Sequence, residues 1–318
     1  SDTGDAYGYN GIFVDGVSKL DAKKGIELTI DSTGDNNASG EYQAWRHGLR
    51  VETQGKVDLG TAVGSVITIN SNAAESYANG VFVDGSSAGS GSEASIKGGD
   101  LTVNINKDNE LQQMDYAAGV TLYNGSKMEL AGDLDIYLEA AGVDGIRANN
   151  LNNYSDINTL QVKNLALYGK AVNGSGSGIY LMGEHDSANV SDSTKIEVTA
   201  EYDAFGIVIE GSDTASSFGA TTIDVTSKTE NNNDVHGIKQ FGAQTDYADL
   251  IINAQSDGAD IFGISLVGHD GAGIVEVAGD LNIKANGNGR YVNGVEVSAL
   301  GKLSVSGKTD IDLSSDND

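Results

Sequence analysis

The stretch GIFVDG at residues 11–16 is the first copy of a phrase that recurs along the whole chain; GLRVET follows at 48–53 and GVFVDG at 80–85. Each copy reads glycine, an aliphatic residue, any residue and then, in all copies but one, a second aliphatic residue. The copies recur about every 31 residues, a period typical of solenoid proteins. Their opening glycines are Gly11, Gly48, Gly80, Gly119, Gly145, Gly178, Gly206, Gly237, Gly263 and Gly294.

Short apolar runs of period two follow each phrase. In the first copy a single apolar residue, Leu20, comes first, and the alternating run of Ile26, Leu28 and Ile30 follows. Such alternation is typical of half-buried strands and not of helices. Three short strands per repeat and about ten repeats predict an all-β fold, a right-handed parallel β-helix (β-solenoid). Each strand would pair with its counterpart one rung away, at about 4.8 Å.

The side chains one and three positions after each glycine are expected to point into the core. The first of these positions is always aliphatic, and the second departs from a larger apolar residue only at Ala148 and Gln240. A core glutamine needs hydrogen-bond partners, or a bulge that turns it outward. We expect the glycine itself to turn a corner before each strand at positive φ, where it has no Cβ penalty.

Composition narrows the setting of the protein. The chain has no cysteine, no proline and a formal net charge of −27. It therefore has neither disulfides nor a cysteine-based zinc site, and nucleic acid and anionic membranes are unfavourable partners. No apolar run is long enough to insert into a membrane as a spanning helix. The unbroken repeat predicts one domain over residues 1–318, and uncapped repeats at both ends predict a piece truncated from a longer rod.

A long, cysteine-free β-solenoid rich in Gly, Asn, Ser and Asp resembles the passenger domain of a bacterial type V autotransporter. The resemblance covers residues 11–313 and rests on period and composition. It implies a secreted virulence factor at the cell surface, attached through an outer-membrane barrel outside this chain. The implied function is that of an adhesin in attachment, auto-aggregation or biofilm formation. Its partner would be a host or bacterial surface protein, a glycan or a second copy.

Catalytic signatures are lacking in the sequence. It contains no G-x-S-x-G elbow, no P-loop and no run of calcium-binding nonapeptides. We therefore expect no enzyme, although two alternatives stay open. One is a β-helical glycoside hydrolase or polysaccharide lyase; the other is a passive stalk that displays a tip domain. The four histidines are expected in solvated turns, too far apart to share a metal ion: His47, His185, His236 and His269.

Three acidic residues occupy the fourth position after the glycine in the first three repeats, Asp15, Glu52 and Asp84. Stacked strands would place these carboxylates about 5 Å apart. Like charges at that distance raise a pKa or recruit a cation, so calcium is the one cofactor we consider. The same separation is that of the two carboxylates in a retaining glycosidase.

An outward stripe lies two positions earlier in each acidic repeat, with Phe13, Arg50 and Phe82. The same stripe continues with Arg147 and Tyr180. Aromatic faces and arginines are suited to hold a sugar ring or a protein partner.

Trp45 and Arg46 precede the second glycine in an expected loop. Both residue types often anchor interfaces, which makes this pair a candidate binding site. In an alternative interpretation, Trp45 caps the core in an aromatic stack with Tyr77 and Tyr116, which hold the same position in the next two repeats.

Overall fold

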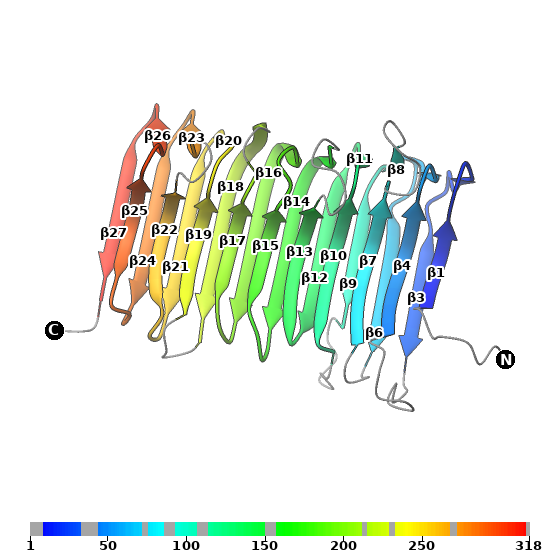
Figure 1. The fold of residues 1–318 in the computed structure, drawn as a ribbon, viewed down its shortest axis with the longest axis horizontal. Helices are drawn as coiled ribbons and strands as arrows, with labels where there is room; N and C mark the ends of the chain where they lie inside the picture. The colour runs from blue at the N-terminus through cyan, green and yellow to red at the C-terminus, as the bar shows by residue number, and fades with distance from the viewer. Residues whose placement is uncertain are drawn as a thin grey trace.

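The computed structural model describes residues 9–32, 44–71, 76–85, 93–106, 114–149, 157–211, 215–228, 233–267 and 272–315. These residues form strands and turns, with no helix among them. The strands pair in parallel and coil into an elongated β-solenoid, with β1 and β27 at opposite ends (Figure 1). The all-β, parallel solenoid predicted from the sequence is therefore confirmed.

The first sheet stacks ten strands in chain order, one from each glycine phrase. Ile12 pairs with Leu49, and Val81 pairs with Val120, so residues at the same place in each phrase lie in register as predicted. The strands are β1 (Tyr9–Val14), β4 (Ala44–Glu52), β7 (Ser76–Asp84), β10 (Tyr116–Tyr123), β13 (Gly142–Asn149), β15 (Gly176–Leu181), β17 (Ala204–Ile209), β19 (Asp234–Gln240), β22 (Asp260–Val267) and β25 (Val292–Ser298).

The second sheet contains the remaining seventeen strands. Two of them are long and each pairs with two shorter strands at once: β14 with β11 and β12, and β18 with β20 and β21. A register shift between Val162 and Asn164 interrupts the pairing of β14 with β16. The strands are β2 (Lys19–Asp21), β3 (Glu27–Ser32), β5 (Lys56–Asp58), β6 (Ser65–Ser71), β8 (Ala94–Gly98), β9 (Leu101–Ile105), β11 (Ser126–Leu130), β12 (Asp133–Ala140), β14 (Thr159–Ala171), β16 (Ser187–Ala200), β18 (Ala215–Ser227), β20 (Gln244–Tyr247), β21 (Leu250–Ser256), β23 (Ile274–Val277), β24 (Leu281–Gly287), β26 (Lys302–Val305) and β27 (Thr309–Ser314).

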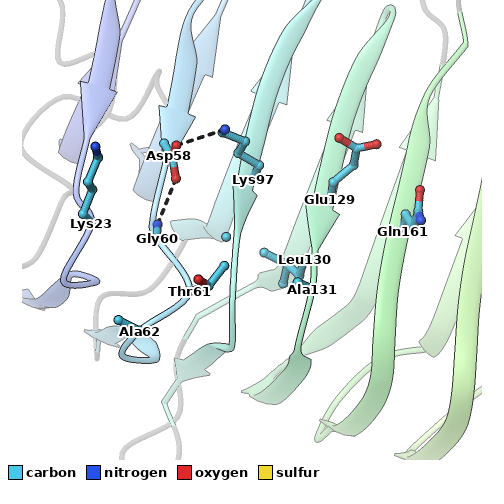
Figure 2. Close-up of a pocket in the computed structure, with 11 residues that line it drawn as sticks. Lys23, Asp58, Gly60, Thr61, Ala62, Lys97, Glu129, Leu130, Ala131 and Gln161 are labelled. Carbon is cyan, nitrogen blue, oxygen red and sulfur yellow. Dashed lines mark hydrogen bonds and ion pairs between the residues drawn. The ribbon is translucent and has the colours of Figure 1, made fainter.

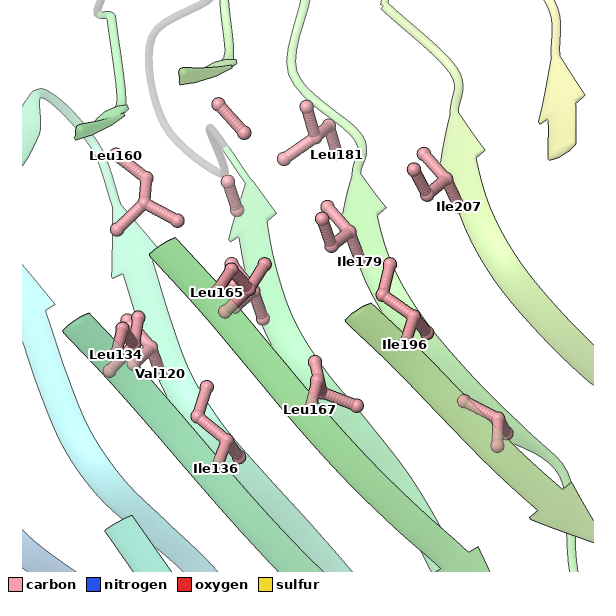
Figure 3. Packing of buried hydrophobic residues seen from close by; sticks show 14 of the residues in the cluster. Val120, Leu134, Ile136, Leu160, Leu165, Leu167, Ile179, Leu181, Ile196 and Ile207 are labelled. Carbon is pink, nitrogen blue, oxygen red and sulfur yellow. The ribbon is translucent and has the colours of Figure 1, made fainter. Parts of the chain in front are cut away.

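The core lies between the two sheets. Val120 and Ile179 of the first sheet and Ile136 and Leu167 of the second belong to one buried cluster (Figure 3). The two inward positions after each glycine are buried from Leu49 to Leu266, as predicted. Val297 in β25 departs from this pattern, with 48% of its surface exposed. Each buried aliphatic side chain contributes about 1.5–3 kcal/mol, so the stacked turns stabilise one another.

The recurring glycine does not turn a corner, so that prediction was wrong. Gly80 lies inside β7, and none of the ten phrase glycines has a positive φ. The residues two before and one after it, Ala78 and Val81, are both fully buried. A Cβ on Gly80 would lie 2.1 Å from Val103 Cγ1 of the second sheet. Glycine recurs because the backbone approaches the opposite aliphatic side chain too closely for any other residue.

Gln240 finds its partners inside the core, as one of the two sequence interpretations required. The side chain is fully buried, and its Nε2 donates to the carbonyl oxygens of Ala243 at 2.7 Å and Ile274 at 3.1 Å. Its Oε1 accepts from the Thr245 hydroxyl at 3.0 Å. The amide is thus satisfied without a bulge at this position.

Candidate binding face

Arg50 lies between two phenylalanine rings on the outer side of the first sheet. Phe13, Arg50 and Phe82 are in register on β1, β4 and β7, as the outward stripe predicted. The guanidinium carbon of Arg50 is 5.3 Å from the centre of the Phe13 ring and 5.6 Å from that of Phe82. Phe13 remains 49% exposed. Cation–π pairs at such exposed sites stabilise by about 0.5–1 kcal/mol.

Trp45, Tyr77 and Tyr116 form the aromatic stack that the alternative interpretation predicted. The rings of Trp45 and Tyr77 are 4.9 Å apart and 27° from parallel, and those of Tyr77 and Tyr116 are 6.0 Å apart. The stack stands on strands rather than in a loop, because Trp45 belongs to β4. It does not cap the core, since Trp45 is 39% exposed on the outer side of the sheet.

The prediction that Arg46 is a binding residue in a loop was wrong. It lies in β4 and not in a loop, and none of its surface is exposed. It stands two positions before Gly48, where Ala78 and Ala117 of the next two strands are also fully buried. That position faces inward because the alternation of inward and outward side chains along the strand shifts by one residue at the glycine. Arg46 therefore cannot contact a partner from this conformation.

His47 joins the two aromatic groups. Its ring lies 6.0 Å from Trp45 and 4.8 Å from Phe82, and its Nδ1 is 3.3 Å from Asn79 Nδ2. Burial, followed by the nearby Arg50 charge, lowers the pKa of His47 to about 3. We use the name aromatic face for Phe13, Trp45, His47, Arg50, Tyr77 and Phe82.

Two histidines are not in solvated turns, so that expectation was wrong for them. His47 is 4% exposed, and His236 is 3% exposed between Phe205 and Phe262. Both stand directly before a phrase glycine on stacked strands, and this shared position is the signal that could have placed them. His185 is partly buried, and His269 lies outside the described residues.

The three acidic side chains are engaged by neighbours. Glu52 and Asp84 are in register, and Arg50 Nε donates to Glu52 Oε1 at 2.7 Å. Asp15 Oδ1 accepts from the Thr53 hydroxyl at 2.8 Å, and Asp84 Oδ1 accepts from the Asn124 side chain at 3.0 Å. Among the residues that the structure describes, no three His, Cys, Asp or Glu side chains are grouped to hold a metal ion. The calcium site stays a prediction.

Arg147 lies on the outward stripe with 29% of its side chain exposed, and its guanidinium is held by neighbouring side chains. Its Nη1 donates to the Tyr116 hydroxyl at 3.3 Å and to Asp144 Oδ2 at 3.4 Å. The hydroxyls of Tyr116 and Ser177 also donate to Asp144. Burial, and then the Asp144 charge, raise the pKa of Tyr116. This polar cluster stabilises the sheet beside the aromatic face.

Tyr180 follows Arg147 in register on β15. Its hydroxyl donates to Glu210 at 3.0 Å, and burial, followed by the Glu210 charge, raises its pKa to about 12. Tyr180 therefore stays a neutral donor at physiological pH. It lies on the predicted stripe, beyond the aromatic face.

Comparison with known proteins returned no relative. The sequence matches no known protein family, no curated protein and no solved structure. In the described part of the chain, no helix is long and apolar enough to cross a membrane. The function proposed below therefore depends on the residues of this chain.

Proposed function

We propose that this chain is the adhesive part of a bacterial cell-surface protein of the type V autotransporter kind. In this proposal the chain is a right-handed β-helix of about ten rungs with three strands each. It binds through the aromatic face and catalyses no reaction. The observation that supports this proposal most is that Arg50 lies between Phe13 and Phe82, next to the stack of Tyr77 with the exposed Trp45.

The composition of this face is that of an interface. Aromatic residues and arginine are enriched in the cores of protein interfaces and dominate their binding energy. Only 6% of the residues of this chain are Phe, Trp or Tyr, and yet four of them gather with a histidine and an arginine on three neighbouring strands. Because a paired sheet holds them, little conformational entropy is lost when a partner binds.

The partner that fits this face is a second copy of the chain. Arg50 lies at the centre of the face with 27% of its side chain exposed, and its charge is paired with that of Glu52. A largely aromatic face whose one cation is already paired is complemented by another partly apolar face, such as the same face of a second copy related by a twofold axis. Attachment to a different surface protein or to a glycan is the outcome that the experiment below distinguishes from self-association.

Display of the chain on a non-aggregating laboratory bacterium tests the proposal. The settling of the cell suspension is compared for the wild type and for Phe13→Ala and Trp45→Ala, at equal surface amounts. Tyr291→Ala is the matched control, because Tyr291 is 56% exposed beside Arg290 on another part of the solenoid. We expect the wild type and Tyr291→Ala to aggregate and the two face variants to remain suspended. Binding only to foreign cells or glycans would replace the second copy by another partner. Equal adhesion by all four proteins would overturn the proposal.

A further inference from the structure

An open groove runs along the second sheet, separate from the aromatic face. Its main part is a pocket of about 710 Å³ that Lys97, Glu129 and Gln161 line on successive strands (Figure 2). A smaller pocket of about 260 Å³ shares Leu130, Ala131 and Gln161 with it and continues to Asn189. We call the two together the axial groove.

One wall of the axial groove carries one polar side chain per strand. Asp58, Lys97, Glu129, Gln161 and Asn189 are aligned in register from β5 to β16. Parallel strands are about 4.8 Å apart, so these hydrogen-bonding groups repeat at that interval. The wall is a row of carboxylate, ammonium and amide groups with a constant period.

Apart from Lys23 and Thr61, the remaining lining of the larger pocket consists of glycine and apolar residues. It includes Gly60, Ala62, Gly98, Leu130 and Ala131. Gly60 has a φ of +70°, and a Cβ there would lie 2.4 Å from the carbonyl oxygen of Lys23. Asp58 Oδ1 accepts from the Gly60 backbone nitrogen at 3.0 Å, which orients the carboxylate within the wall. Small residues leave room for a ligand to lie against the polar row.

The charges that line the larger pocket of the axial groove balance, and Lys163 of the smaller pocket lies 3.9 Å from Asp192. Lys23 and Lys97 oppose Asp58 and Glu129, and Lys97 Nζ is 3.1 Å from Asp58 Oδ2. A polyanion gains little from such a site and is repelled by the −27 charge of the chain. The groove is therefore suited to an uncharged ligand that offers many hydroxyl groups.

We propose that the axial groove binds a linear, neutral polysaccharide that lies parallel to the solenoid axis. A strand spacing of about 4.8 Å is close to the length of one pyranose unit in an extended chain, so successive sugars meet successive wall residues. An extended peptide advances about 3.3 Å per residue, so its repeat does not match the spacing of the polar side chains in this row. The apolar lining contacts the C–H faces of the sugars while the wall binds their hydroxyls.

Calorimetric titration of the whole chain tests this inference. The probes are neutral β-1,4-linked hexasaccharides of glucose, xylose and mannose, the matching disaccharides, and an anionic hexagalacturonate. We expect one neutral hexasaccharide to bind more tightly than its disaccharide and more tightly than the anionic probe. Glu129→Ala and Gln161→Ala should each weaken that binding about tenfold, the effect of losing one good hydrogen bond.

Glu276→Ala is the matched control for Glu129→Ala. Glu276 occupies the same outward row on β23 and pairs with Lys302 at 3.1 Å, as Glu129 pairs with Lys127 at 2.8 Å, but it lies outside the groove. It should bind as the wild type does, and circular dichroism checks that all variants are folded. The inference is overturned if no neutral hexasaccharide binds at millimolar concentration, if the anionic probe binds best, or if Glu276→Ala weakens binding as much as Glu129→Ala. Phe13→Ala should leave glycan binding unchanged, which separates this site from the aromatic face.

Discussion

The ring of His236 lies face to face with that of Phe262, with centres 4.7 Å apart and planes 9° from parallel. Phe205 stacks on it from the preceding strand at 5.5 Å. Among the described residues neither ring nitrogen has a hydrogen-bond partner, and the Asp234 Oδ2 atom is 3.7 Å from Nε2, too far for a hydrogen bond. Burial lowers the pKa of His236, although Asp234 opposes that shift.

The buried histidines make the stability of the fold sensitive to acid. In the unfolded chain a histidine takes up a proton near pH 6.5, whereas folded His236 and His47 stay neutral at that pH. The unfolded state then binds more protons, so the free energy of unfolding falls as the pH drops below about 6.5. Each histidine contributes at most about 1.4 kcal/mol per pH unit.

Chemical denaturation at pH 8 and pH 5 measures this effect. His236→Phe continues the stack between Phe205 and Phe262 and should lose less stability at pH 5 than the wild type loses. His185→Gln, at a histidine outside both aromatic stacks, should behave as the wild type does. The explanation fails if His236→Phe keeps the full pH dependence of the wild type.

Two glycines of β13 should differ sharply in their tolerance of alanine. A Cβ on Gly145 would lie 1.8 Å from Leu167 Cδ1 and 2.5 Å from the Gly178 carbonyl oxygen, whereas the nearest atoms to a Cβ on Gly142 are at 3.6 Å. Gly145→Ala should lower the free energy of unfolding by about 1–3 kcal/mol through overpacking. Gly142→Ala should change it by about 0.5 kcal/mol or less. Thermal melting compares the two variants, and equal melting temperatures would refute the close-approach explanation.

The hydrogen bonds of the buried Gln240 amide should contribute more to the stability of the fold than the volume of its side chain does. Gln240→Leu keeps a comparable volume but removes the hydrogen bonds to Ala243, Ile274 and Thr245. We expect a loss of about 2–4 kcal/mol in the free energy of unfolding, since each bond contributes about 0.5–1.5 kcal/mol. Gln244→Leu, which removes a single bond to Asp246 on a partly exposed side chain, should cost about 1 kcal/mol or less. A Gln240→Leu protein as stable as the wild type would show that the core does not need the amide.

The spacing of the glycine phrases was sufficient to predict which strands pair and in which register. Leu49 and Val81 must be inward together, because a slip of one residue would expose every aliphatic side chain of a strand. The same register predicted that Phe13, Arg50 and Phe82 are neighbours on adjacent strands. The aromatic stack of Trp45 and Tyr77 was also predictable, because both residues stand three positions before their glycines.

Contacts across the core were not predictable from the period. The function of Gly80 depends on Val103 in the opposite sheet, and no pattern within one strand shows that distance. The side chain of Arg46 points inward because the inward–outward alternation of side chains along β4 shifts by one residue at Gly48. A glycine expected at a corner, outside the strand, does not predict that shift. The axial groove was not predictable, because it depends on small residues from separate turns of the solenoid, such as Gly98 in β8 and Ala131 after β11, that form no motif in the sequence.

Sedimentation velocity of the purified chain over a range of concentrations tests the central claim, that the aromatic face joins two copies, most directly. We expect reversible self-association of the wild type that Phe13→Ala, Trp45→Ala and Arg50→Ala each weaken and that Tyr291→Ala leaves unchanged. Runs with and without millimolar calcium also test the cation predicted for Asp15, Glu52 and Asp84. A wild-type chain that stays monomeric in both conditions, or that associates equally in every variant, would contradict the account.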